Sequence, residues 1–457
     1  MIVMKFGGTS IENATAIDRV ACIVKERIEQ RPVVVVSAMA KVTDTLVAMS
    51  KAAGSDQRDQ ALELCHGLRE RHYAAASELL GHVNAAEIYS QIKAEFDSLD
   101  DLLRGISAVG ELTPRSTDNV LSYGERISSL MVTAAFAVRG IDSVLVDARD
   151  VMITDNRHTH AMPQMDVIGE RLRERVRPLI EAGRIPVMGG FIGATPERVS
   201  TTIGRGGSDF SAAIVGAGLG AEKIEIWTDV DGMKTTDPNL CPDARRIKVI
   251  SFEEAAELAY FGAKVLHPAT LLPAIQKNIT VYVLNSRNPK NEGTRIQSRA
   301  PKSRNVFKAV AAKKRITVIE IVAARMLMAH GFLKSIFEIF DRHRCPVDVV
   351  STSEVSVSLT VDSNEAIPAI AADLQHLADV KYEGRKAIVC LVGENIRGTS
   401  GIAAKLFSAL ADINVRMISQ GASEINITFV IDEDDVPEAV RRLHDTFFSE
   451  VDPEVFE

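Results

Sequence analysis

The first ten residues, MIVMKFGGTS (1–10), decide how the rest of the chain is interpreted. A short apolar run carries Lys5 and ends at two glycines, which is typical of a β-strand that enters a tight turn. Apolar residues then recur at helical spacing, and Thr9 or Ser10 is placed to cap that helix. The helical positions are Ile17, Val20, Ala21, Val24 and Ile28. The segment therefore predicts a strand, a turn and a helix in succession.

This succession repeats along the chain to about residue 295. The run RPVVVVSAM (31–39) is typical of a parallel strand that is buried on both faces. Further strand candidates, most of them separated by helical stretches, are residues 143–148, 185–193, 223–230 and 280–285. Alternation of this kind predicts an α/β fold with a mainly parallel sheet covered by helices.

Two stretches stand out as helical. Residues 56–110 are rich in charged residues and in helix formers, which predicts a helical subdomain or lid. In residues 251–270, Ser251 and Glu254 have the spacing of a capping box, and Pro268 would end the helix.

Composition limits the classes of protein to which the chain can belong. The 457 residues suffice for several domains, and the net charge of −8, with no dense Lys/Arg run, argues against a nucleic-acid partner. The chain has five cysteines, an odd number that cannot pair completely, and none of them shows CxxC spacing. This favours free thiols in the cytoplasm. No apolar run reaches the length of a membrane span, so we expect no membrane partner.

The C-terminal part of the chain contains an internal repeat. Residues 288–305 are polar and contain Pro and Gly without a clear period, so we interpret them as a linker. Beyond them, residues 331–362 align with residues 401–432 at a constant offset of 70, and each copy predicts a helix, a strand, a turn and a strand. We therefore expect a catalytic domain over residues 1–297 and two α+β modules over residues 306–385 and 386–457.

Two glycine-rich passages suit the binding of an anion. In KFGG, a lysine precedes glycines whose amides, with the dipole of the next helix, favour phosphate. A Walker A loop places its lysine after the glycines, and the chain has no such match. The alternative is that Lys5 is an ordinary lysine at the end of a strand.

The second passage is TTIGRGGSDFSAA (201–213). Arg205 offers a planar fork for a carboxylate or a phosphate, Ser208 can cap the next helix, and Asp209 falls in the first turn of that helix. The alternative is that Asp209 only caps the helix. We favour a functional site, because a cap does not require an Arg, three glycines, a Ser and an Asp within six residues.

Other polar residues follow predicted strands or lie in predicted helices. Thr228 and Asp229 lie in WTDVDGMKTTDP (227–238), at the strand end where ligands of open α/β sheets bind, although the same letters also form turns. Ser37 ends the second strand, and Thr43 lies in the loop or helix start beyond it.

The remaining candidates are titratable pairs. Glu125 and Arg126 lie in SYGERISS (122–129), where an exposed ion pair on a helix is the alternative to a function. His158 and His160 are two residues apart without a third ligand nearby, which favours loop residues over a metal site. We predict no metal site built from protein side chains.

Together these stretches resemble the aspartate kinases, which belong to the amino acid kinase superfamily, over nearly the whole chain. The segments KFGGTS, SYGER, TTIGRGGSD, WTDVDG and SFEEAAELAYFGAKVLHPAT occur in the order and spacing of that family. The repeat resembles the paired, ferredoxin-like ACT modules of these enzymes and is most similar to the lysine-sensitive single-function class. The resemblance implies ATP-dependent phosphorylation of the side-chain carboxylate of L-aspartate to 4-phospho-L-aspartate, the first step toward lysine, threonine and methionine.

The resemblance also implies roles for single residues. Lys5 would bridge the transferring phosphoryl group, and Asp209 would orient the lysines and the glycine-rich loops. The aspartate pocket would consist of Arg205 at the α-carboxylate, Glu125 at the α-ammonium, and Ser37 and Thr43. The nucleotide would be contacted by Lys5, Gly7, Gly8, Thr9, Ser208, Thr228, Asp229, Lys234 and Lys264, and Mg²⁺ would be carried on the ATP phosphates. Relatives often have Tyr at the position of Lys234 and Arg at that of Asn239, so nucleotide contacts there differ.

Regulation is implied by the first ACT module. Its effector site would consist of Met326, Ala329, Phe332, Leu333, Val347, Asp348, Ser353 and Glu354. Lysine-sensitive relatives have Ser at the position of Ala329, a departure that would weaken the affinity for lysine. The other residues of this site are kept, so L-lysine is the favoured effector and L-threonine is the alternative. ACT modules usually associate, which implies a homodimer or a dimer of dimers.

Two other functions are weighed against this one. The first is a kinase of another small carboxylate on the same fold, which the Glu125 and Arg205 clamp and the paired ACT modules disfavour. The second is a non-catalytic amino-acid sensor that uses only its ACT modules, which the intact Lys5 and Asp209 disfavour.

Overall fold

The computed structural model describes residues 1–204, 206–262, 266, 268–323 and 330–457, without the side chains of residues 82–85, 268 and 269. The chain forms two compact units. The first comprises residues 1–233, 248–252 and 265–300, and the second comprises residues 234–247, 253–264 and 301–457. Two short segments of the expected catalytic domain, residues 234–247 and 253–264, thus pack with the C-terminal part of the chain.

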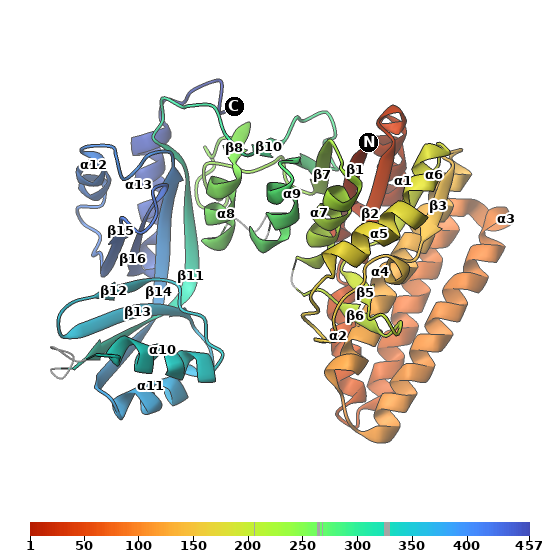
Figure 1. Cartoon of the computed structure of the whole chain (residues 1–457), viewed down its shortest axis with the longest axis horizontal. Coiled ribbons are helices and arrows are strands. Elements are labelled where there is room, and N and C mark those ends of the chain that lie inside the picture. The colour runs from red at the N-terminus through yellow and green to blue at the C-terminus, as the bar shows by residue number, and fades with distance from the viewer. Residues whose placement is uncertain (205, 263–265, 267, 324–329) are drawn as a thin grey trace. The chain divides into compact units, whose positions relative to one another are not determined.

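Eight described strands of the first unit form one sheet, in the order β3-β4-β2-β1-β7-β9-β10-β8 (Figure 1). The strands are β1 Ile2–Phe6, β2 Pro32–Val36, β3 Ser143–Val146, β4 Ile185–Gly189, β7 Lys223–Thr228, β8 Val249–Ser251, β9 Thr280–Asn285 and β10 Thr294–Gln297. Neighbouring strands are parallel except β9 and β10. The central strands β1, β2 and β4 are buried along their whole length, which explains their continuous apolar runs. The predicted mainly parallel sheet is confirmed.

Strand β10 corrects the predicted linker over residues 288–305. Residues 294–297 pair with β9 and with β8, so this part of the stretch belongs to the sheet. Thr294 and Ile296 are buried, and the Thr294 hydroxyl accepts a hydrogen bond of 2.8 Å from the Met233 amide. A four-residue strand with alternating polar residues gives too short a pattern to be separated from a linker by sequence.

Helices flank this sheet, and α4 and α7 pack directly against its strands (Figure 1). The α-helices of this unit are α1 Ala14–Lys25, α2 Val42–Ala53, α3 Arg58–Val109, α4 Pro114–Val138, α5 Met165–Arg175, α6 Arg177–Glu181, α7 Gly207–Leu219 and α9 Leu272–Gln276. Helix α8, Phe252–Tyr260, belongs to the second unit from residue 253 onward. The short 3₁₀ turns are η1 Gly8–Ile11, η2 Ile28–Gln30, η3 Ala148–Asp150 and η4 Pro268–Leu271, and β5 Ile192–Ala194 pairs with β6 Ser200–Thr202. None of the described helices combines the length and hydropathy needed to cross a membrane.

The start of α1 differs from the prediction of a Thr9 or Ser10 cap. Residues 8–11 form the turn η1 first, and Asn13 caps α1 by accepting a hydrogen bond of 2.9 Å from the Ala16 amide. The Ser10 hydroxyl instead donates to Trp227 O and to the Ser286 hydroxyl. The helix begins later because the glycine turn must first bring the chain back over the sheet.

The predicted helical subdomain at residues 56–110 is found as α3. Gly81 has non-helical backbone angles (φ 67°), so α3 consists of two helices joined at a kink. His72 packs edge-on against Phe96 and Tyr73 against Tyr89, and these contacts hold the two helices together.

The helix predicted over residues 251–270 is shorter than expected. Helix α8 begins directly after Ser251 but ends at Tyr260, not at Pro268. Gly262 has a φ of +130°, a conformation that ends a helix. The apolar spacing beyond Tyr260 had suggested a longer helix, but spacing alone does not show where the backbone turns.

The second unit contains a six-stranded antiparallel sheet in the order β12-β13-β11-β14-β16-β15. The strands are β11 Phe307–Val322, β12 Val350–Thr352, β13 Ser356–Asp362, β14 Asp379–Gly393, β15 Met417–Gln420 and β16 Asn426–Asp432. Helices α10 Phe332–Arg342 and α11 Ile367–Gln375 pack together, as do α12 Ile402–Ala409 and α13 Val436–Phe448 (Figure 1). Both repeats therefore have the predicted helix, strand, turn and strand.

The long strands β11 and β14 join the two repeats into one sheet. The second half of β11 pairs with β13, whereas its first half pairs with the part of β14 that also pairs with β16. Residues 307–313 thus extend the sheet of the second repeat although they precede the first repeat in sequence. This sharing of strands could not be derived from the repeat itself.

A buried ion pair links α8 to β11 inside the second unit. Lys308 Nζ lies 3.1 Å from Glu254 Oε2, and the two side chains are only 1% and 2% exposed. Lys308→Met should lower the free energy of unfolding by about 3–5 kcal/mol, because it leaves the Glu254 carboxylate buried without this counterion. Urea denaturation followed by circular dichroism measures the change.

The control for this prediction is Arg441→Met, which removes an exposed pair with Glu438 and Asp445. That variant should unfold at nearly the wild-type urea concentration. An equally small change in Lys308→Met would contradict the importance of the buried pair.

Candidate active site

The predicted site residues of the first unit gather at one edge of its sheet. Strands β1, β2, β4 and β7 are mutually parallel, so their carboxyl ends meet there. This edge of an open α/β sheet is where ligands bind. Lys5 lies near the end of β1, Ser37 follows β2, and Thr228 ends β7.

Lys5 is held at this edge by Asp209. Lys5 Nζ lies 2.6 Å from Asp209 Oδ1 as an ion pair, although the approach lacks the angles of a hydrogen bond. Both side chains are largely buried, and Asp209 belongs to the first turn of α7. A cation next to the amino end of a helix forms a positive region that suits phosphate oxygens.

The glycines after β1 differ in what their amides can do. The Gly7 amide donates a hydrogen bond of 3.0 Å to Trp227 O, so it is not free to bind a phosphate in this arrangement. The Gly8 amide has no hydrogen-bond partner among the described residues. A Cβ at Gly8 would lie 2.8 Å from Ala38 O, so only glycine fits there. Of the two glycine amides implied as a phosphate cradle, that of Gly8 remains available.

Glu125 is buried rather than exposed on the surface of α4. Its Oε1 accepts a hydrogen bond of 3.1 Å from the Ala38 amide, and its Oε2 has no partner among the described residues. Burial raises the pKa of Glu125 to about 8, although the Ala38 hydrogen bond and the Lys5 charge act in the opposite direction. A buried carboxylate with one unused oxygen suits a cationic group of a ligand.

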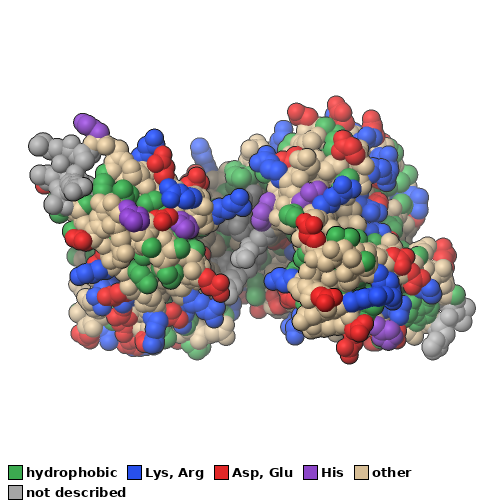
Figure 2. Space-filling model, turned by 90° about the horizontal axis from the view of Figure 1, so that it is seen from below, with side chains coloured by type: hydrophobic (Ala, Val, Ile, Leu, Met, Phe, Trp, Pro, Cys, Tyr) green, Lys and Arg blue, Asp and Glu red, His purple; other side chains and the backbone are tan. Residues whose placement is uncertain are grey.

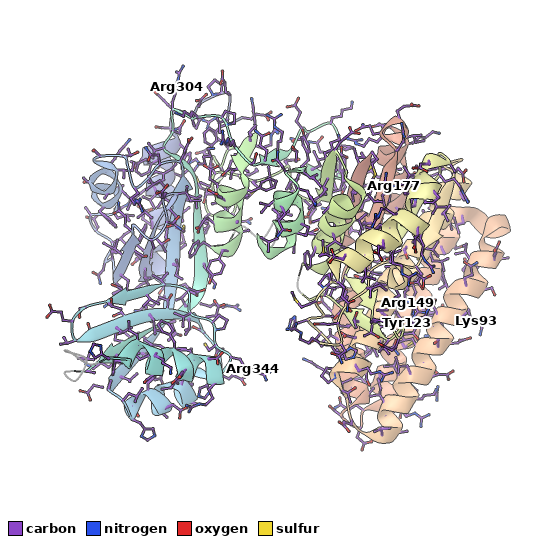
Figure 3. The ribbon with its side chains drawn as sticks, viewed as in Figure 1. Lys93, Tyr123, Arg149, Arg177, Arg304 and Arg344 are labelled. Atoms are coloured by element: carbon purple, nitrogen blue, oxygen red, sulfur yellow. The ribbon has the colours of Figure 1, made fainter. Side chains whose placement is uncertain are left out.

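Arg126, the next residue, faces other partners. It pairs with Glu95 of α3 at 2.5 Å and lies over the ring of Tyr123, which Figure 3 labels. The exposed ion pair between Glu125 and Arg126, weighed as the alternative, is therefore wrong. A cavity of about 290 Å³ on this side of α4 is lined partly by Glu95, Arg126 and Arg149, and Glu125 does not line it. We do not assign this cavity to the site.

Two glycines that were not identified from the sequence allow the elements of the site to pack closely. A Cβ at Gly189 would lie 2.9 Å from Glu125 Cβ, and a Cβ at Gly190 would lie 2.8 Å from Ser208 Cα. These residues at the end of β4 therefore allow α4 and α7 to approach the same point. The dipeptide follows an apolar strand, and that pattern was a usable signal for close packing.

Ser208 does not cap α7, contrary to the prediction. The helix begins at Gly207 with Gly206 as its N-cap, so Ser208 is the second helical residue. The amides of Gly207 and Asp209 already donate to backbone carbonyls, whereas the Ser208 amide has no backbone partner among the described residues. Ser208 can thus offer an amide and a hydroxyl to an anion.

The loop after β2 is fixed through its backbone. The Ser37 amide donates to Phe6 O at 3.1 Å, and Ser37 O accepts a hydrogen bond of 2.7 Å from the Ser128 hydroxyl. Thr43 is the second residue of α2. Within the described part of the chain, the hydroxyls of Ser37 and Thr43 make no hydrogen bond.

Thr228 is the last residue of β7, which pairs with β9, and Asp229 follows it. The Thr228 hydroxyl donates to Asp229 Oδ1 at 3.2 Å, and Thr228 O accepts from both the amide and the hydroxyl of Ser286. The Asp229 side chain is exposed. Ser286 was not identified from the sequence, because it follows a strand whose end carried no glycine-rich motif.

Asp118 was also missed. It is fully buried and accepts hydrogen bonds from His158 Nδ1, from the Thr159 amide and from the Thr202 hydroxyl. Asp118 therefore anchors the loop of residues 157–160 beside β6, which explains His158 without a metal. Among the described residues no three His, Cys, Asp or Glu side chains converge as a metal site.

Four predicted site residues, Arg205, Lys264, Met326 and Ala329, lie outside the described residues. Lys234 belongs to the second unit, where it forms a β-bridge with Arg246.

The other predicted effector residues lie in the first repeat of the second unit. Phe332 and Leu333 begin α10, and Val347 and Asp348 precede β12. Ser353 and Glu354 lie exposed in the turn between β12 and β13. The Ser353 hydroxyl lies 2.7 Å from the Ser356 hydroxyl, and Asp348 Oδ1 lies 3.0 Å from Lys313 Nζ.

Comparisons with known proteins agree with this arrangement. The amino acid kinase family matches residues 1–285, and the ACT domain matches residues 389–447. The chain is 36% identical to aspartokinase 2, chloroplastic, of Arabidopsis thaliana, which covers 99% of this chain and 85% of that protein. It is 34% identical to lysine-sensitive aspartokinase 3 of Escherichia coli, which covers 98% of this chain and 99% of that one.

Two solved structures are similar along nearly the whole chain. The structure of E. coli aspartokinase III with aspartate and ADP (R-state) has a TM-score of 0.87 at 34% identity and covers 98% of this chain and all of the other. The structure with lysine and aspartate (T-state) has a TM-score of 0.83 at 35% identity and covers 98% and 99% of the two chains. The chain therefore belongs to the amino acid kinase family and, within it, to the aspartokinases that carry ACT domains.

Proposed function

We propose that this aspartokinase binds ATP and L-aspartate at the carboxyl edge of the first sheet and that L-lysine inhibits it through the first ACT repeat. One observation carries the catalytic assignment. The buried Lys5–Asp209 pair lies at the strand ends near Glu125, whose Oε2 has no partner among the described residues.

The reaction joins two anions, and the site is suited to offset their repulsion. The β-carboxylate of aspartate is already a nucleophile, so the protein needs no strong general base. Lys5 neutralises charge on the transferring phosphoryl group, while Asp209 keeps the ammonium in place. The Gly8 amide and the first turn of α7 add dipoles that favour phosphate oxygens. Mg²⁺ would shield the ATP phosphates when it is bound.

Aspartate is oriented by its α-substituents. Glu125 accepts the α-ammonium with its unused oxygen, and Arg205 binds the α-carboxylate as a bidentate pair. Ser37 and Thr43 complete the pocket, and Thr228 and Asp229 face the nucleotide. For Mg²⁺, which keeps water and phosphate ligands, a single carboxylate suffices, and Asp229 offers an exposed one at the end of β7.

L-Lysine is the effector that the first repeat suits better. Asp348 and Glu354 give this site two carboxylates for an effector that carries two ammonium groups. The similarity to E. coli aspartokinase III, which has been solved with lysine, supports the same choice. Titrating ADP release with L-lysine and with L-threonine tests the proposal. Inhibition by threonine alone would contradict it.

Self-association would complete the regulatory region, and we propose at least a homodimer. Leu333 and Phe337, one turn apart on α10, are exposed, and strand β12 is an edge strand with exposed residues. Figure 2 shows hydrophobic side chains among the charged ones on the surface of the second unit. Analytical ultracentrifugation would measure the mass, and a monomer at assay concentration would contradict this part of the proposal.

Asp348→Ala and Glu354→Ala should each raise the L-lysine concentration that halves the rate by about tenfold or more. The loss of a hydrogen bond to a charged group costs about 1.5–3 kcal/mol, and 1.4 kcal/mol corresponds to a factor of ten. The measurement is ADP release at several lysine concentrations.

Glu424→Ala is the matched control, because Glu424 occupies the position of Glu354 in the second repeat. It should keep wild-type sensitivity to lysine. Loss of the uninhibited rate in both test variants would count against their assignment to the effector site.

A further inference from the structure

The proposed effector carboxylate is already occupied by groups of the chain itself. Asp348 Oδ1 accepts a hydrogen bond of 2.6 Å from the Tyr260 hydroxyl, and both Asp348 oxygens accept bonds from Lys313 Nζ, at 3.0 and 3.1 Å. Lys313 also pairs with Asp362 at 2.9 Å. The Asp348 side chain is only 4% exposed as a result.

The bound group has the same chemistry as the proposed effector. The Lys313 ammonium is the side-chain cation of lysine, held between two carboxylates and 5.3 Å from the centre of the Tyr260 ring. Burial lowers the pKa of Lys313, but its hydrogen bonds to Asp362 and Asp348 outweigh burial and raise it, so the group is charged. A free cation therefore reaches Asp348 only by displacing a bound one.

The second repeat has no acid at the position that corresponds to Asp348. Asp362 corresponds to Asp432, and a lysine, Lys386, pairs with Asp432 at 2.6 Å. The position of Asp348, however, is taken by the exposed Ile418. Lys386 is also held between two carboxylates, but its second acid is Glu383, at 2.9 Å on the same strand β14. An acid at the position of Asp348 is therefore confined to the first repeat.

We propose that Lys313 is an internal occupant of the effector site, which a cationic amino acid must displace from Asp348. This inference rests on the proposed effector site. The same carboxylate accepts a hydrogen bond from the hydroxyl of Tyr260, the last residue of α8, two residues before the backbone turn at Gly262. Effector binding and the end of α8 are thereby linked through a single carboxylate, and the linkage can be only as strong as the difference in affinity between the two arrangements.

Lys313→Met removes the internal competitor and leaves Asp348 and Asp362 facing an open position. When a site is blocked most of the time, its apparent affinity equals the intrinsic affinity multiplied by the fraction of molecules in which the site is free. Each rate is taken relative to the uninhibited rate of the same protein. On this scale, the L-lysine concentration that halves the rate should be about three- to tenfold lower for Lys313→Met than for wild type. Lys386→Met, which removes the lysine that pairs with Asp432 in the second repeat, should keep the wild-type rate and sensitivity.

Calorimetry of the full chain with L-lysine and with L-norleucine separates competition from a structural effect. Norleucine has nearly the same shape as lysine but no side-chain cation, so Lys313→Met should bind lysine more tightly without gaining affinity for norleucine. An equal gain for both ligands, or none for lysine, would overturn the proposal. The thermal midpoint of each variant shows whether it is folded.

The possible results also separate this proposal from the assignment of the effector. If lysine inhibits wild type and inhibits Lys313→Met no better, the effector assignment stands and the role of Lys313 is refuted. If lysine inhibits only Lys313→Met, the result supports Lys313 as the internal occupant of the effector site and refutes lysine control of the wild-type enzyme. If lysine inhibits neither protein, both are refuted.

Discussion

Lys5→Met should lower kcat by about two to three orders of magnitude, with a much smaller change in the KM for aspartate. The substitution keeps an unbranched side chain that is one atom shorter, and it removes the charge that offsets the repulsion between phosphoryl group and carboxylate. Because this repulsion is greatest when the two groups react, the loss falls mainly on the transition state. Steady-state ADP release at saturating substrates measures it.

Lys223→Met is the matched control for that prediction. Lys223 begins β7, the strand next to β1, and pairs with Ile2 in the sheet rather than with the end of β1. It forms an ion pair with Glu225, so its removal also breaks a lysine–carboxylate contact. The control should retain kcat within about twofold, as expected for a partly exposed pair remote from the strand ends. Near-normal turnover of folded Lys5→Met would exclude Lys5 from the reaction.

Glu125→Gln should lower kcat/KM for aspartate by about two orders of magnitude, because the α-ammonium loses a buried anionic partner. In the wild-type enzyme the same group should give a pH dependence. Its pKa of about 8 means that Glu125 is largely protonated at lower pH, so kcat/KM should rise between pH 6.5 and 8.5. Once aspartate is bound, its ammonium holds Glu125 ionised, and kcat should vary much less over this range.

The glutamine variant should lose this rise in kcat/KM with pH. Glu95→Gln, which alters the carboxylate paired with Arg126, should keep it. Stability should vary in the opposite sense. The folded pKa of Glu125 lies above its ordinary value of 4.5, so the ligand-free protein should lose stability as the pH rises from about 4.5 to about 8. A pH profile of kcat/KM shared by wild type and Glu125→Gln would rule out the proposed role.

The sequence predicted the elements that bury continuous apolar runs. Strands β1, β2 and β4 are buried from end to end, so their residues could hardly form anything else. The short strand β10 and the early end of α8 were not predictable, because each depends on distant partners or on one glycine with positive φ. The shared sheet of the two repeats could not be predicted either. An internal repeat shows that two segments have similar sequences, but it does not show that β11 pairs with β14.

For the site, the motifs indicated which residues to examine but not their environment. From the sequence, Glu125 is equally compatible with an exposed position on a helix and with a buried site. Its burial follows from the close approach of Gly189 and from the hydrogen bond of the Ala38 amide. The use of the Gly7 amide by Trp227 depends on β7, which lies more than 200 residues further along the chain. Lys313 carried no motif at all, and only the fold brings it to Asp348.

The most direct test of the central claim is the formation of aspartyl hydroxamate from L-aspartate, ATP, Mg²⁺ and hydroxylamine by the full-length protein. Hydroxylamine traps an acyl phosphate, so the product reports transfer of the phosphoryl group to a carboxylate and not simple ATP hydrolysis. We expect hydroxamate to form with L-aspartate and to fall to a small fraction in Lys5→Met. ADP release without hydroxamate, or no turnover by the folded wild-type protein, would contradict the assignment of this site to aspartate phosphorylation.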